Sequence, residues 1–142
     1  MKLIETLSIM NECLEKMIQL SQTFLNQAQK NNFKGVDQFD ESREVNFKFL
    51  VQCNQSLDAL TQALIPVQLP QETQNRLRDL ALDYHSLART LSLIDEKIEI
   101  HIESHQSLIR KELTVLEKQS LHVKKFKSTW LPESGERLDD QI

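Results

Sequence analysis

Glycine and proline are scarce in this sequence of 142 residues, which contains two glycines and three prolines. Hairpin turns depend on these residues, so the composition leaves little turn chemistry for a β-sheet. Neither residue occurs between Gln71 and Ser128, where apolar residues return every three or four positions. Gln, Leu, Glu and Lys, which suit helices, are abundant. The sequence therefore predicts an all-α protein.

A surplus of positive charge is also missing, because the formal net charge is −4. Neutralising phosphates requires surplus Lys and Arg, so we do not expect a nucleic-acid partner. One local exception is the stretch 110–127, which contains six basic and two acidic residues. The last twelve residues contain four acidic residues and one basic residue.

No long apolar run occurs at the N-terminus, where acidic residues interrupt the apolar stripe of the first twenty residues. This pattern predicts neither a signal peptide nor membrane insertion. The only cysteines, Cys13 and Cys53, lie beside apolar helical positions and form no metal or redox pair in the sequence. We expect buried, reduced thiols in a cytoplasmic protein.

Three helices are predicted, at about 2–30, 36–64 and 71–128. Asn31, Asn32 and Gly35 tolerate the left-handed conformations that end helices, and Pro66 and Pro70 bracket the second linker. Short connections place consecutive helices antiparallel. Residues 1–130 are thus expected to form an antiparallel three-helix bundle or coiled coil, followed by a flexible acidic tail at 131–142.

Each predicted helix has an apolar seam that should face the core. The expected inward residues of the first helix are Leu3, Leu7, Met10, Leu14, Met17, Ser21, Phe24 and Ala28, with Ile4, Ile18 and Leu25 widening the seam. Those of the second are Phe39, Phe47, Leu50, Leu57, Leu60 and Leu64. Those of the third are Leu77, Leu80, Tyr84, Leu87, Leu91, Ile94 and Ile98.

The third helix is long for this bundle, at roughly 85 Å against about 45 Å for either earlier helix. After Ile98 the next seam positions are occupied by His101 and His105. The apolar repeat then resumes shifted by one residue, at Ile102, Ile109 and Leu113. The alternative is a break near Ser104 that produces a four-helix bundle, but no Gly, Pro or Asn offers a turn there. We favour the unbroken helix, whose surplus apolar surface indicates a protein partner.

Catalytic patterns are lacking as well. His101 and His105 would share a helical face, but a zinc site needs more ligands, so they fit a polar interruption of the seam better. No phosphate-binding glycine loop and no nucleophile with an organised base is present. We expect no enzymatic activity, cofactor or metal.

One enzyme-like alternative centres on His85, which faintly resembles the histidine of phosphotransfer domains. Leu87 matches their pattern. Ala88 and Arg89 stand where those domains have a Lys that neutralises phosphate and a small Gly. A solvated histidine beside the seam is the better interpretation.

The order of elements resembles that of a known family. The first amphipathic helix closes with Phe33-Lys34-Gly35-Val36, and Arg43 follows within a polar stretch. After the proline-marked linker, the last helix contains Ile94, Asp95, Lys97 and Ile98 and later Ile109, Lys111, Glu112 and Leu113, and a polar tail follows. This arrangement is similar to the small cytoplasmic chaperones of bacterial flagellar type III export, the FliT-like and FlgN-like proteins.

The resemblance implies a binding protein that holds the helical C-terminal region of a late flagellar substrate, such as the filament cap or a hook-filament junction protein. It also implies delivery of this client to the export apparatus, through the export ATPase or the export gate. The partner-binding residues would be Ile109, Leu113, Leu116, Val123 and Phe126, with Lys118 and Lys124 beside them. The alternative from another class is a homodimeric coiled-coil adaptor or regulatory protein, in which residues 108–123 pair with those of a second copy.

Overall fold

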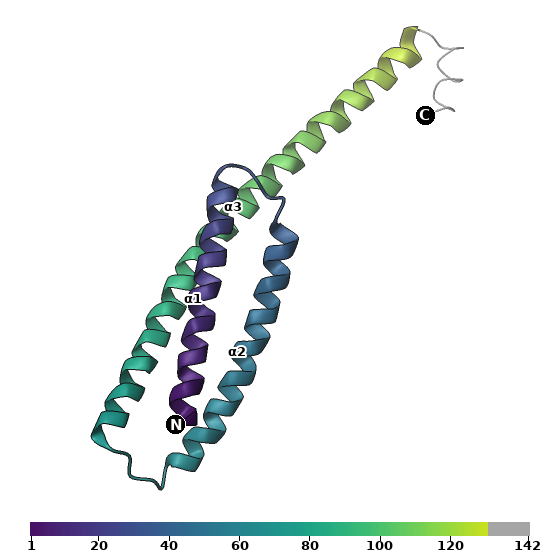
Figure 1. The fold of residues 1–142 in the computed structure, drawn as a ribbon. Coiled ribbons are helices and arrows are strands. Elements are labelled where there is room, and N and C mark those ends of the chain that lie inside the picture. The colour runs from purple at the N-terminus through teal and green to yellow at the C-terminus, as the bar shows by residue number, and fades with distance from the viewer. Residues whose placement is uncertain (131–142) are drawn as a thin grey trace. The chain divides into compact units, whose positions relative to one another are not determined.

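A computed structural model describes the backbone of residues 1–130 and the side chains of residues 1–126. It consists of α1 (Lys2–Gln29), α2 (Val36–Leu64) and α3 (Gln71–Trp130) (Figure 1). The all-α class and the long third helix are confirmed, with helix ends within two residues of those predicted. The four-helix alternative is wrong, because α3 continues through Ser104 without a break. The predicted tail at 131–142 lies outside the described residues.

The chain divides into two compact units, and the boundary falls within α3. Met1–Ile102 contains α1, α2 and the first part of α3. Within this unit α2 returns antiparallel to α1, and α3 runs back in the direction of α1 (Figure 1). We call this unit the bundle. The second unit begins at Glu103, and its described part is the remainder of α3.

The predicted helix stops have the expected backbone geometry at the end of α1. Asn31 has a left-handed φ of 59°. The Asn31 and Asn32 amides donate to the carbonyl oxygens of Ala28 and Gln27, both at 2.9 Å, which closes the last turn in a Schellman motif. Gly35 has an ordinary φ of −88° and precedes α2, so its place at the helix start does not depend on glycine's conformational freedom.

The core lies mainly along α1, whose predicted seam is buried at every position from Leu3 to Ala28. Two clusters form it. The first joins Met10, Leu14 and Met17 of α1 to Leu50 of α2 and Leu91 of α3. The second joins Phe24, Leu25 and Ala28 to Ile94 and Ile98, and there Phe24 stacks on Phe39 with ring centroids 4.5 Å apart. The seam predicted for α3 is likewise buried or half-buried throughout.

The expected inward register of α2 is wrong at one position, because the Phe47 side chain is 62% exposed. Apart from the half-buried Val36 and Ser42, the half-buried and buried positions of α2 are 39, 43, 46, 50, 53, 57, 60 and 64. This heptad pattern places Arg43 and Asn46 on the seam and leaves Phe47 beside it. Counting back from Leu50 in steps of four, three and four residues gives this register, and the polar Asn46 and Arg43 take seam positions that were not predicted to face inward.

Candidate functional site

The C-terminal part of α3 carries the candidate binding surface. It consists of seven apolar side chains that are each between 42% and 62% exposed. We call this surface the C-terminal apolar face: Leu108, Ile109, Leu113, Val115, Leu116, Val123 and Phe126. Every partner-binding residue predicted from the sequence is exposed, Lys118 and Lys124 included. Leu108 and Val115 widen the predicted row.

Helix geometry brings these side chains to one side of α3. At about 100° per residue, Ile109, Leu113, Leu116 and Val123 fall within about 80° of one another, and Leu108 and Val115 lie next to them. Lys124 borders the edge near Leu113, and Lys118 borders the edge near Val115. The face is therefore a broad stripe that is mostly apolar, in which Glu112 and Gln119 lie between Leu116 and Val115. An exposed amphipathic stripe of this kind is typical of a helix that docks on another helix.

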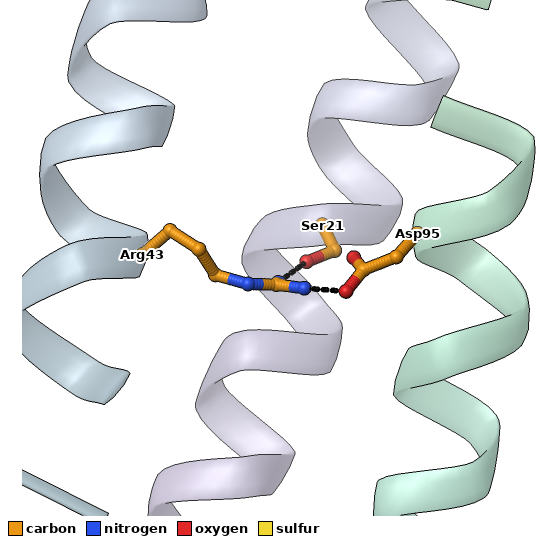
Figure 2. A network of polar contacts seen from close by, with 3 residues as sticks. All are labelled: Ser21, Arg43 and Asp95. Carbon is orange, nitrogen blue, oxygen red and sulfur yellow. Dashed lines mark hydrogen bonds and ion pairs between the residues drawn. The ribbon is translucent and has the colours of Figure 1, made fainter. Parts of the chain in front are cut away.

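The bundle contains a polar layer that links all three of its helices (Figure 2). Arg43 of α2 donates from Nη1 to the Ser21 hydroxyl of α1 at 2.6 Å, and its Nη2 forms an ion pair with Asp95 of α3. Ser21 is fully buried, and the Arg43 guanidinium lies over the Phe39 ring, 5.7 Å from the centroid. Burial lowers the pKa of Arg43, which still stays charged at physiological pH.

This layer was not predicted, although its signal is present in the sequence. Arg43 stands in the heptad register between Phe39 and Leu50, where a charged side chain needs a partner within the bundle. Asp95 follows the buried Ile94 on α3 and supplies that partner. Such an interaction fixes which residues of the three helices face one another. We assign it a structural role, because it holds the helices in register.

Removing one partner of the layer should destabilise the bundle. We expect Asp95→Ala to lower the free energy of unfolding by about 1 to 3 kcal/mol, since it leaves a partly buried guanidinium with one neutral acceptor. Glu44→Ala is the matched control, because it breaks the exposed pair between Glu44 and Lys48 and should cost well under about 1 kcal/mol. Urea unfolding of both variants measures this. Equal losses would contradict a special role for the layer.

The histidines do not assemble a site in the described chain. His85 is exposed between half-buried Tyr84 and Leu87, as a solvated histidine would be. His101 and His105 are half-buried at the interruption of the seam. Among the side chains that the structure describes, no three His, Cys, Asp or Glu residues gather as they would around a metal ion.

Both cysteines are unbridged thiols: Cys13 belongs to the first core cluster, and Cys53 packs against that cluster. Cys13 is buried and its Sγ lies 3.9 Å from the Asn46 carbonyl oxygen, whereas Cys53 is half-buried. Burial raises the pKa of both thiols, and for Cys13 the neighbouring Cys53 adds to the effect. The structure thus places the two thiols in one cluster, which their separation in sequence did not predict.

The two thiols should differ in reactivity. The thiolate is the reactive form, so raised pKa values make both cysteines slow towards alkylating reagents at neutral pH. We expect Cys53 to react first, because Cys13 becomes accessible only when the helices separate. Mass spectrometry of a time course with iodoacetamide, at native conditions and in urea, measures the order. Faster native labelling of Cys13 would contradict the packing described.

The fold and the exposed face define the chain as an all-α helical bundle with an apolar face on its last helix. A scan against protein-family models finds no match, and comparisons with curated proteins and with solved structures find no significant similarity. None of the helices in the described part of the chain combines the length and apolarity needed to cross a membrane.

Proposed function

We propose that this chain is an export chaperone of the bacterial flagellum, which works in the cytoplasm without enzymatic activity. It binds the helical C-terminal region of a late flagellar substrate, a filament cap or hook-filament junction protein, and delivers it to the export apparatus. The observation that carries the proposal is the exposure of the C-terminal apolar face. The resemblance of the sequence to the FliT-like and FlgN-like chaperones supports the choice of client.

The chemistry of the C-terminal apolar face suits a helical client. Isoleucine, leucine and valine side chains spaced along one side of a helix bury their surface best against a second amphipathic helix. Each fully buried side chain of this kind contributes roughly 1.5 to 3 kcal/mol. Lys118 and Lys124 at the two edges would accelerate encounter with a client helix that carries acidic residues beside its apolar stripe.

Delivery requires a second surface that the client leaves exposed. The bundle offers candidates, because apolar side chains of α1 and α2 remain exposed there, among them Ile9, Leu20 and Phe49. In this proposal the export ATPase or the export gate contacts the loaded chaperone while the client occupies the C-terminal apolar face. Client binding and export-apparatus binding would then be separable by mutation.

Co-expression tests the proposal. The chain is produced with each late flagellar substrate encoded in the same genome, both intact and without its last helical segment. We expect one intact substrate to co-purify in a stoichiometric complex and its truncated form to be lost. Failure of every intact substrate to bind, with the chain itself folded by circular dichroism, would overturn the proposal.

A further inference from the structure

A groove runs between α1 and α2 on a side of α1 that α3 does not cover. Asn11, which lies about 180° around α1 from Leu20, donates to the Leu80 carbonyl oxygen of α3 at 3.1 Å, so α3 lies on the opposite side. Each wall of the groove consists of two rows of side chains that repeat every seven residues. We call this surface the α1–α2 groove: Thr6, Ile9, Cys13, Lys16, Leu20, Thr23 and Gln27 of α1, with Gln38, Ser42, Val45, Phe49, Gln52 and Ser56 of α2.

Two hollows lie along the α1–α2 groove. One, of about 370 Å³, has Thr23 and Ser42 in its lining. The other, of about 270 Å³, has Ile9 and Ser56 in its lining. Ile9 and Thr23 are fourteen residues apart, as are Ser42 and Ser56, so the hollows are about 21 Å apart along either helix. A helix docked in the groove would therefore direct two side chains, fourteen residues apart, into the hollows.

The α1–α2 groove has few charges. Lys16 is the one charged residue among its thirteen members, whereas charged residues make up 27% of the whole sequence. Ile9, Leu20 and Phe49 are 39% to 46% exposed in it. Depletion of charge around exposed apolar side chains is typical of the centre of a protein interface. The groove therefore suits a mostly apolar helix that carries one acidic residue near Lys16.

The C-terminal apolar face has this pattern at the same spacing. Ile109 and Val123 are fourteen residues apart, with Leu116 midway between them, and Lys16 is likewise midway between the hollows. Glu112 is the one charged residue within the face and lies one turn, about 6 Å, from Leu116. With Ile109 and Val123 over the hollows, the alkyl stem of Lys16 lies against Leu116 and its ammonium group reaches Glu112.

We propose that residues 103–126 of one copy dock along the α1–α2 groove of a second copy, as a fourth helix of its bundle. The contact joins two unlike surfaces, so it is heterologous. It involves no client and therefore goes beyond the proposed function. One docked helix forms a small interface, so we expect association above about 10 μM and monomers in more dilute solution. This contact covers both apolar surfaces when no client is bound.

Contacts between like surfaces are less favourable. Residues 103–126 contain five basic and three acidic residues, so pairing this segment with its own copy brings together two segments of like net charge. Two grooves face to face set hollow against hollow, which leaves voids where a stable interface is close-packed. The side-chain ridge of a single helix fills a groove between two helices instead.

Exchanging the two charges in the full chain, without client, tests the inference. Sedimentation velocity over a concentration series should show association of the unchanged chain. Lys16→Glu and Glu112→Lys should each weaken it about fivefold to tenfold, because each brings like charges together. The chain with both changes regains an opposite pair and should associate like the unchanged chain. Glu117→Lys is the matched control, since Glu117 lies about 140° around α3 from Glu112, and it should change association less than about twofold.

Alkylation of Cys53 locates the contact on the bundle. Cys53 lines the same hollow as Ile9, so its reaction with iodoacetamide should slow as the chain associates. At the same concentration, the Glu112→Lys variant should react faster than the unchanged chain. Circular dichroism melts check that the variants remain folded, as expected because Lys16, Glu112 and Glu117 are exposed.

Four results would overturn the inference, and none of them bears on client binding. The first is a chain that stays monomeric at about 100 μM. The second is association that Lys16→Glu leaves unchanged, which would indicate pairing between C-terminal segments, or that Glu112→Lys leaves unchanged, which would indicate pairing between grooves. The third is a folded double variant that does not regain association. The fourth is a Cys53 reactivity that does not change as the chain associates.

Discussion

Replacing Ile109, Leu113 and Leu116 together by Ser should abolish client binding while leaving the bundle intact. The three side chains are 42% to 59% exposed, so the folded chain loses little burial when they become polar. A bound client would lose three apolar anchors, each worth roughly 1.5 to 3 kcal/mol. The expected loss of affinity is therefore more than about a thousandfold. Titration calorimetry with the co-purifying client and a thermal melt of the variant measure the two effects.

The matched control replaces three exposed leucines outside the C-terminal apolar face, namely Leu82, Leu93 and Leu121. These side chains are 62%, 55% and 60% exposed, and Leu121 lies about 140° around the helix from Leu116. Their replacement by Ser should leave client affinity within a few fold of that of the unchanged chain. If the first triple variant unfolds, its residues belong to a core and the site is misplaced. If it stays folded and binds normally, the site is also misplaced.

Truncating a central residue of α1 should have the largest effect on stability. Leu14 is 3% exposed and packs in the first core cluster with residues of all three helices. We expect Leu14→Ala to lower the free energy of unfolding by about 2 to 5 kcal/mol, from lost burial and from the cavity that remains. Urea denaturation followed by circular dichroism measures the change.

Phe47→Ala is the control for the α2 register. Phe47 is mostly exposed, so its truncation in the monomer should cost well under about 1 kcal/mol. In a core position, the same change would cost about 3 to 5 kcal/mol. A large loss for Phe47→Ala together with a small loss for Leu14→Ala would contradict the packing of the bundle.

The sequence was sufficient to predict the three helices and the seams of α1 and α3. Their apolar residues repeat at alternating intervals of three and four over many turns, and such a pattern has one buried side. The left-handed Asn31 and the two prolines of the second linker marked the chain reversals for equally local reasons. These features depend on residues close together in the sequence, which is why they could be predicted.

The register of α2 could not be predicted in the same way. Sequence patterns place apolar residues inward, so they favour Phe47 as a core residue over the polar Arg43 and Asn46. Arg43 occupies the seam because its guanidinium binds the Ser21 hydroxyl and the Asp95 carboxylate. Asn46 occupies the seam beside Cys13, whose Sγ lies near the Asn46 carbonyl oxygen. Both reasons involve residues of other helices. A buried polar residue is recognised only when its distant partner is known.

The position of the candidate site along α3 could be predicted from the sequence, but its full width, which includes Leu108 and Val115, could not. A helix longer than its neighbours leaves apolar residues beyond any local partner, and Ile109, Leu113, Leu116 and Val123 are exposed accordingly. The exposure of Phe47 escaped sequence reasoning because the predicted seam of α2 placed this side chain in the core.

Hydrogen exchange with and without client tests the central claim most directly. In the chain alone, residues 103–126 should exchange faster than residues of the buried α1 seam, because exposed helix without tertiary packing opens readily. Adding the co-purifying client should slow exchange over residues 108–123 and leave exchange in α2 and in the core of the bundle unchanged relative to the chain without client. Protection confined to residues 2–102, with residues 103–126 exchanging as before, would contradict the assignment of the C-terminal apolar face as the client site.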